Sequence, residues 1–257
     1  MIALPYRPPY RWDALVAFLS ARAIDAIESF ADGRYRRGGV SIAFDDASVI
    51  LSRGDGEESG RGGPVFAAQD DMARARRMFD LDADSIEIDR HLALDTLLCK
   101  IMRPGTRVPG AWEPFEVAVR AIVGQQISVR GATTIMNRLA PILTPQQLAE
   151  AELPGMPRAR AEAIRGLARA VADDATLLAP AASLDESIER LTAMRGIGPW
   201  TAQYIAMRAL HHPDAFPSSD LGLRKAAAAM RINDLEKRAE RWRPFRAYAA
   251  MLLWESL

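Results

Sequence analysis

The segment 191–208, LTAMRGIGPWTAQYIAMR, has the residue types of a phosphate-binding turn between two helices. The first helix is expected to end near Met194, and Thr201 belongs to the second. Gly196 and Gly198 bracket the turn, where glycine allows positive φ and leaves the backbone uncovered. Exposed amides at the start of the second helix can then bind a phosphate whatever the base sequence. An ordinary turn with a glycine cap has the same pattern, and the two glycines alone favour that interpretation.

A carboxylate follows this turn. Asp220 lies 22 residues after Gly198, in the segment 216–221, FPSSDL, which precedes another predicted helix. Aspartate is a favoured N-cap residue, so a structural role explains Asp220 taken in isolation. The helix dipole also keeps a carboxylate ionised there, which suits an anion that faces positive charge rather than a proton donor. Asp220 is therefore a candidate both for a cap and for electrostatic catalysis.

The elements that must position these residues are almost all helices. From Pro114 onward, apolar residues recur at helical spacing in short segments with short connections, which predicts a compact helical bundle. The predicted helices cover residues 115–123, 129–143, 145–151, 158–172, 187–194, 201–211, 221–230 and 235–257.

The first hundred residues predict a mixed domain instead. Two β-rich runs flank Asp45-Asp46, which indicates a hairpin, and the glycine-rich charged segment Arg53–Pro64 indicates a mobile loop. The predicted elements are helices at 14–30, 72–79 and 89–100 and strands at 40–44 and 48–52. The expected fold class is therefore α+β, with a small N-terminal antiparallel sheet domain followed by helical domains.

Composition restricts the function classes. The chain has 257 residues, 49% of them hydrophobic and 26% charged, which is typical of a globular protein with a substantial core. The single cysteine, Cys99, excludes an intramolecular disulfide and a four-thiolate iron–sulfur cluster, and the three histidines lack metal-ligand spacing. No apolar run approaches the roughly 20 residues of a membrane span, and the N-terminus lacks a signal peptide's apolar run. We expect a cytoplasmic protein without membrane contact and without a metal held by side chains.

The net charge is zero, but its distribution is uneven. Residues 1–99 contain 12 Lys and Arg against 17 Asp and Glu, whereas residues 100–257 contain 21 against 16. Most of the positive residues in the second part are arginines, which suit bidentate phosphate contacts. If the protein binds nucleic acid, the helical part is therefore the expected contact surface.

The turn and the aspartate together resemble a known arrangement. GIGPWTAQY at 196–204, followed by DAFPSSDLGLR at 214–224, resembles the hairpin, Gly/Pro-rich loop and aspartate of the helix-hairpin-helix superfamily of DNA glycosylases. Three further segments resemble the bacterial 3-methyladenine DNA glycosylase II family: PPYRW at 8–12, AIVGQQIS at 121–128 and AERWRP at 239–244. The likeness therefore extends over nearly the whole chain.

This resemblance implies a three-domain layout and an activity. The expected domains are the sheet domain at 1–95, a helical domain carrying the hairpin at 114–213, and a second helical domain lining the base pocket, formed by 96–113 and 214–257. The implied activity is excision of alkylated bases from double-stranded DNA by a monomer. Because such enzymes reach the glycosidic bond only in a flipped nucleotide, the resemblance also implies base flipping.

The resemblance assigns roles residue by residue. Asp220 matches the catalytic carboxylate, which stabilises the oxocarbenium-like sugar left by the departing base. Trp200 stands where strand-cleaving relatives carry a Schiff-base lysine, so the implied product is an abasic site in an intact strand. Lys225, the nearest lysine downstream, is expected to be a surface residue or a phosphate contact.

The remaining implied residues form a pocket, a wedge and a phosphate contact. Aromatic faces attract a desolvated cationic base by about 2 kcal/mol, and the implied pocket consists of Trp200, Tyr204, Trp254, Phe18 and Leu221. The wedge that fills the gap left by the flipped nucleotide matches Gln126, with Gln125 beside it. The hairpin residues expected at a DNA phosphate are Gly196, Gly198 and Thr201. A sodium or potassium ion, the sole implied cofactor, would lie on the backbone carbonyls of Thr192, Met194 and Ile197.

This sequence departs from the family pattern at two places. Gln126 replaces an apolar wedge, and Leu221 and Gly222 stand where bulkier residues close the pocket, which predicts a wider mouth and a shifted specificity. Two alternatives stay open. One is a glycosylase for deaminated or oxidised bases, although the aromatic pocket and the missing lysine disfavour oxidised guanine. The other is a non-catalytic helix-hairpin-helix module in which Asp220 serves only as a cap.

Overall fold

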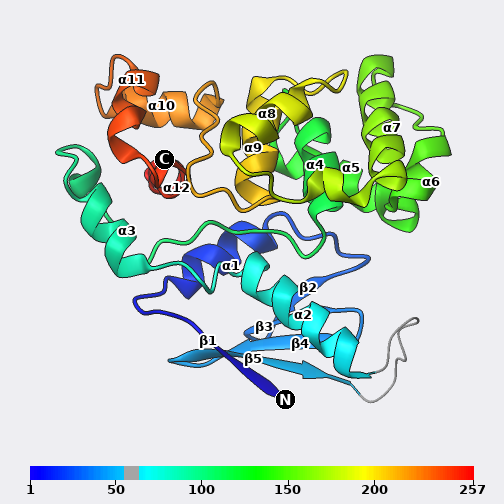
Figure 1. The fold of residues 1–257 in the computed structure, drawn as a ribbon, viewed down its shortest axis with the longest axis horizontal. Helices are drawn as coiled ribbons and strands as arrows, with labels where there is room; N and C mark the ends of the chain where they lie inside the picture. Colours follow the sequence, from blue (N-terminus) through cyan, green and yellow to red (C-terminus); the bar gives the residue numbers. More distant parts are fainter. Residues whose placement is uncertain (55–63) are drawn as a thin grey trace.

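The structure is a computed structural model that describes residues 1–54 and 64–257. Figure 1 shows a sheet covered on one side by two helices, with a layer of further helices beyond them on that same side, which confirms the α+β class. The predicted loop Arg53–Pro64 falls mainly on residues 55–63, which lie outside the described residues. Within the described part, no helix is long and apolar enough to cross a membrane.

The N-terminal sheet has five antiparallel strands in the order β1-β5-β4-β3-β2. They are β1 (Ile2–Pro5), β2 (Ser29–Ala31), β3 (Arg34–Arg37), β4 (Val40–Phe44) and β5 (Ser48–Arg53). The predicted hairpin is confirmed as β4 and β5, with Ile42 opposite Leu51. The other three strands were not predicted, because each has only three or four residues and β3, RYRR, carries a single apolar side chain, the buried Tyr35.

Two helices, α1 (Trp12–Ser20) and α2 (Pro64–Met78), cover the sheet on the side that faces the helical part (Figure 1). The predicted helix at 14–30 is wrong beyond Ser20. The amides of Ile27 and Glu28 donate to the Ile24 carbonyl in a turn, and Phe30 pairs opposite Tyr35 in the sheet. Pairing between β2 and β3 therefore overrides the helical periodicity.

The helical part contains ten α-helices. They are α3 (Ser85–Leu92), α4 (Pro114–Val123), α5 (Val129–Leu139), α6 (Pro145–Glu150), α7 (Arg158–Asp173), α8 (Leu184–Thr192), α9 (Pro199–Arg208), α10 (Leu221–Ala229), α11 (Leu235–Ala239) and α12 (Arg246–Glu255). Each helix predicted between 115 and 230 is confirmed, with small shifts at its ends.

Two other predicted helices are interrupted. The segment 89–100 is not one helix, because α3 ends at Leu92 and the Asp95 carboxylate accepts the Leu97 and Leu98 amides at the start of a separate 3-10 turn. The segment 235–257 is also broken, between α11 and α12. Pro244 lies in this break, where it has no N–H to continue a helical ladder.

Two buried apolar clusters support this architecture. The smaller joins the sheet with α1 and α2 around Tyr35 and Phe79. The larger contains residues of both predicted helical domains, with α4 at its centre against α5, α7 and α9. It also takes up Ile88 and Leu92 of α3, which the expected boundary at 95 assigns to the sheet domain. The domain boundaries themselves stay predictions.

Candidate active site and DNA interface

The hairpin lies between the end of α8 and the start of α9. Gly196 has φ +87°, and a Cβ there would lie 2.5 Å from the Cβ of Ala163 in α7, so both the backbone conformation and the packing require glycine. Gly198, the N-cap of α9, has φ −87° and open space around it. The expectation of positive φ therefore holds for Gly196 alone, while Gly198 leaves the approach to α9 uncovered.

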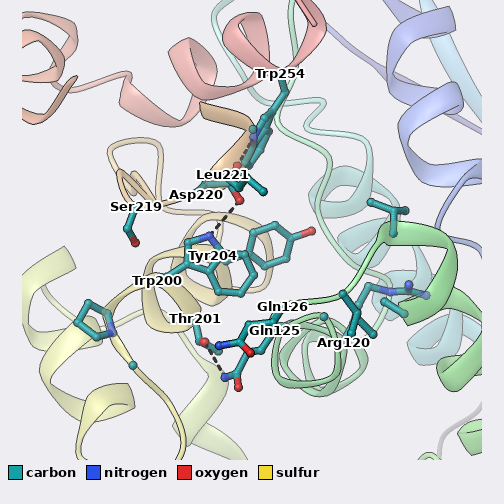
Figure 2. Close-up of a pocket in the computed structure, with 18 of the residues that line it drawn as sticks. Arg120, Gln125, Gln126, Trp200, Thr201, Tyr204, Ser219, Asp220, Leu221 and Trp254 are labelled. Atoms are coloured by element: carbon teal, nitrogen blue, oxygen red, sulfur yellow. Dashed lines mark hydrogen bonds between the residues drawn. The ribbon is translucent and has the colours of Figure 1, made fainter. Parts of the chain in front are cut away.

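A glutamine joins the hairpin to the loop after α4. Gln125 Nε2 donates to the Gly196 carbonyl at 3.0 Å. It also donates to Thr201 Oγ1 at 3.0 Å (Figure 2). Arg160 Nη2 donates to the Gln125 carbonyl at 2.6 Å. Thr201, expected at a phosphate, is buried, and its hydroxyl accepts a hydrogen bond from Gln125, so its phosphate contact stays a prediction. Gln125 holds the hairpin and the loop together, and the wedge role predicted for it stays a prediction.

The candidate catalytic carboxylate is held on both oxygens. Asp220 is the N-cap of α10, because Oδ1 accepts the Leu223 amide at 3.0 Å. Trp254 Nε1 also donates to Oδ1, at 2.9 Å, and Trp200 Nε1 donates to Oδ2 at 3.0 Å (Figure 2). The capping interpretation is therefore correct and compatible with a site role. Sequence reasoning placed both tryptophans near a base but did not foresee that they position the aspartate.

The predicted pocket residues line one cleft of about 2150 Å³. Trp200 and Tyr204 stack with ring centroids 5.5 Å apart and an angle of 19°, and Trp254 lies 6.4 Å from Tyr204. Phe18 reaches the cleft from α1, and Leu221 borders it with 67% of its surface exposed. The structure thus brings together all five predicted pocket residues around Asp220, while their contacts with a base stay a prediction.

The glycine after Leu221 has a packing role. A Cβ on Gly222 would lie 3.0 Å from Asp220 Oδ1 and 3.1 Å from Trp254 Nε1. The absence of a side chain there lets the indole approach the carboxylate. Gly222 therefore has a second consequence besides the wider pocket mouth that the sequence predicts: it makes room for the Trp254 indole beside Asp220.

Three arginines that sequence reasoning missed also surround the aromatic residues. We call Arg22, Arg120 and Arg208 the arginine cluster. The guanidinium carbon of Arg22 lies 3.5 Å from the Phe18 ring centroid, and that of Arg208 lies 4.8 Å from it. Among the described residues, none of the three has a carboxylate within 4.0 Å, so their charges are not neutralised by an ion pair.

Hydrogen bonds fix the arginine cluster in place. Arg208 donates to the carbonyls of Pro109 and Gly110, at 2.6 and 2.9 Å, and to the Tyr204 hydroxyl at 3.0 Å. Arg120 donates to the Arg22 carbonyl at 2.5 Å. A sequence signal was available, because Arg22 follows Phe18 by four residues and Arg208 follows Tyr204 by four, a spacing that puts two side chains on one face of a predicted helix. Tyr204 and Arg208 do share a face of α9, whereas Arg22 lies in the turn after α1.

The arginine cluster changes the acidity of the pocket. Burial would raise the pKa of Tyr204, but the charges of Arg208 and Arg22 and the hydrogen bond from Arg208 outweigh it and lower this pKa to about 8. Burial lowers the pKa of Arg120 to about 10, with repulsion from Arg208 and Arg22 acting in the same direction. The end of the cleft near Tyr204 is therefore strongly positive, and the Asp220 end is negative.

The carbonyls expected to hold a monovalent ion lie in the hairpin turn. The Met194 carbonyl accepts the Ile197 amide at 3.1 Å and keeps a second lone pair. The Thr192 hydroxyl donates back to the Ile188 carbonyl at 2.8 Å, which uses its proton and leaves its oxygen lone pairs. The monovalent ion at these carbonyls stays a prediction.

The amino-acid sequence is similar to a family of DNA-repair proteins over its whole length. Residues 1–113 match the family model described as the AlkA N-terminal domain. Over the full length of this chain, the sequence is 36% identical to the "Probable bifunctional transcriptional activator/DNA repair enzyme AlkA" of Mycobacterium tuberculosis. The chain spans only 57% of that longer protein. It is 32% identical to "DNA-3-methyladenine glycosylase 2" of Escherichia coli, over 99% of this chain and 96% of that protein.

A solved structure shares the fold. The 3-methyladenine DNA glycosylase of Archaeoglobus fulgidus superposes with a TM-score of 0.81 at 20% identity, over 99% of this chain and 98% of that one. The agreement over full length with the Escherichia coli protein is the decisive finding. The chain therefore belongs to the DNA-3-methyladenine glycosylase 2 (AlkA) family.

Proposed function

We propose that the chain is a monofunctional DNA glycosylase that flips alkylated bases of the 3-methyladenine and 7-methylguanine type out of double-stranded DNA and releases them hydrolytically. The observation that carries this proposal is the Asp220 carboxylate, fixed by two indole N–H groups in an aromatic cleft. The name of the Escherichia coli relative supports the same substrate class.

Asp220 supplies the negative charge that the reaction needs. When the N-glycosidic bond breaks, the base leaves with the bonding electrons and positive charge develops on the sugar. A carboxylate that is already oriented stabilises this charge without reorganisation. Oδ1 accepts two hydrogen bonds and Oδ2 only one, so Oδ2 keeps the freer lone pair for the sugar or for the water that adds to C1′. The water oxygen forms the bond to C1′, and one of its two protons then passes to solvent, which leaves a hydroxyl on the sugar.

The aromatic walls favour a cationic base. N-alkylation at position 3 or 7 makes a purine positively charged, and the stacked faces of Trp200 and Tyr204 attract such a ring. A charged base is also a good leaving group, so the reaction needs no general acid. By the family resemblance Trp200 stands where strand-cleaving relatives carry the Schiff-base lysine, and Lys225 is exposed on α10, which supports hydrolysis without strand cleavage.

The arginine cluster favours a second candidate substrate class. Arg120 and Arg208 are engaged by protein oxygens, and the Arg22 side chain donates from Nη1 to the Phe18 carbonyl and also interacts with the Tyr204 hydroxyl. Its other N–H groups suit the carbonyl oxygen of a neutral, deaminated base. A positive cluster also disfavours a cation, so the two classes compete in this pocket.

The DNA backbone would lie along the hairpin. Gly198 leaves the first turn of α9 uncovered, and its unpaired amides suit a phosphate. A sodium or potassium ion on the nearby carbonyls would add positive charge at the same point. One subunit contains the complete set of these groups, which supports a monomer.

An excision assay tests the proposal. Wild type is expected to release 3-methyladenine from methylated duplex DNA and to leave alkali-labile sites without cutting the strand. Release of hypoxanthine alone would support the deaminated-base candidate instead. DNA binding without release of any base would indicate the non-catalytic module.

A further inference from the structure

The loop between α4 and α5 presents two side chains at the mouth of the cleft. Its turn is tight, because the Ile127 amide donates to the Gly124 carbonyl at 3.3 Å and Gln126 adopts φ +60°. Ser128 then caps α5, with its Oγ accepting the Gly131 amide at 3.1 Å. Gln126 and Ile127 are both exposed at the tip, and both line the cleft.

This tip is fixed from behind. Gln125 is bonded through its side chain to the hairpin and through its carbonyl to Arg160 of α7. The residue before the tip is therefore held by two separate elements, and the Ser128 cap holds the residue after it. A loop anchored in this way presents its side chains with a smaller loss of backbone entropy on binding.

Exposed apolar side chains are concentrated at this mouth. Among the described residues, seven large hydrophobic side chains are exposed, and three of them line the cleft. Ile127 is 37% exposed, Val129 at the start of α5 is 44% exposed, and Leu221 borders the cleft from α10. The other four lie at the chain termini, on α3 or in the turn after it: Met1, Leu257, Ile86 and Leu94.

We propose that Ile127 acts with Gln126 as a two-part wedge in duplex DNA, a proposal that rests on the proposed function. Ile127 supplies the apolar contact to neighbouring bases that Gln126 lacks, and the Gln126 amide hydrogen-bonds the orphaned base. Ile127, rather than Val129, takes this role because it lies at the tip beside Gln126. Ile127 is thus a positioning residue that stabilises the flipped state.

A local structural role is the competing explanation. Ile127 precedes the N-cap Ser128, where an apolar residue often packs on the fourth helical residue. That residue is Ala132, which offers a single methyl group for such packing and is buried, with 5% of its surface exposed. A staple of this kind predicts lower stability and equal losses on all substrates, so the two roles are separable.

The test compares single-turnover excision of one lesion opposite its normal partner and opposite a mismatch. The variants are Ile127→Ala, Ile127→Leu and Gln126→Ala, with Ile86→Ala as a control at an exposed isoleucine outside the cleft. Unstacking is easier at a mismatch, so Ile127→Ala is expected to lower the paired rate about tenfold more than the mismatched rate. Ile127→Leu is expected to retain most of the paired rate, and Ile86→Ala to change neither.

Equal losses on both substrates, with a lower Tm, or no loss at all would overturn the wedge. A 2-aminopurine beside the target base provides a readout independent of excision, because its fluorescence rises on unstacking. If wild type releases no base but unstacks the duplex in a manner that depends on Ile127, the proposed function fails and the wedge stands. If base release is normal and the 2-aminopurine fluorescence is the same with and without the Ile127 side chain, the wedge proposal alone fails.

Discussion

Replacing Asp220 by asparagine removes the charge at the site while keeping the side-chain length and the helix cap, because Asp and Asn cap about equally well. The carboxylate accepts three hydrogen bonds, from Trp200, Trp254 and Leu223. Asparagine has one acceptor oxygen. If that oxygen keeps the Trp254 and Leu223 bonds, the amide NH2 faces the Trp200 N–H, donor against donor.

Two effects of different size follow. The Trp200 donor is part-buried, so leaving it unpaired costs at most the roughly 1–3 kcal/mol of a buried donor, which corresponds to a Tm lower by up to roughly 2–10 °C for a chain of this size. Loss of the anion removes stabilisation of the sugar cation. Single preorganised groups of this kind are worth roughly 10²–10³ in rate, so single-turnover excision is expected to fall at least that far. DNA affinity should be unchanged.

The double variant Asp220→Asn/Trp200→Phe separates these effects. It removes the unpaired indole donor, so the Tm is expected to recover while excision stays lost, and Trp200→Phe alone serves as the matched control. Melting curves and single-turnover release of 3-methyladenine give the two readouts. Excision by Asp220→Asn within tenfold of wild type, or its recovery in the double variant, would refute the electrostatic role of Asp220.

Three further predictions concern the hairpin and titratable groups. Gly198→Ala should keep the wild-type Tm but weaken binding to all duplex sequences in gel shifts. Gly196→Ala should weaken binding and also lower the Tm, because alanine at the positive φ of residue 196 costs about 1–2 kcal/mol. Equal Tm values for the two variants would contradict this difference. The other four tyrosines have raised pKa values, so Tyr204 alone should ionise near pH 8 by absorbance at 295 nm. Arg208→Met should move that transition upward, and an unmoved transition would exclude the arginine as its cause. Burial lowers the pKa of His211 to about 4. Because the unfolded chain binds this proton from about pH 6.5 downward, the free energy of unfolding should fall by up to about 3 kcal/mol between pH 6.5 and 4. In urea unfolding, His211→Asn should show a smaller decrease of this free energy over the same pH range.

The sequence predicted most of the site because its key residues follow one another on short, regular elements. Asp220 stands at a helix start, and the hairpin glycines lie on the turn that precedes α9, so local patterns and the family resemblance were sufficient to locate them. Contacts between distant segments were not accessible in this way. The bond from Trp254 to Asp220 joins residues 34 apart, and Gln125 reaches across 71 residues to Gly196.

The fold was predicted well where helices are long and poorly where tertiary contacts decide. Residues 21–30 have helical periodicity, yet Phe30 gains more by pairing in the sheet. The short charged strand β3 has no two-residue alternation to detect, because only Tyr35 faces the core. The arginine cluster was missed because its members come from three elements, although the spacing from Phe18 to Arg22 and from Tyr204 to Arg208 was visible.

Phe18 and Arg22 belong to the segment that packs on the N-terminal sheet, yet they line the cleft. Whatever binds in that cleft therefore contacts the sheet domain as well as the helices. By linkage, a ligand that holds α1 in place stabilises the strands on which α1 rests. Amide protons of β4 and β5, far from any base, should then exchange more slowly with deuterium when the cleft is filled, and the sheet becomes a remote reporter of lesion binding.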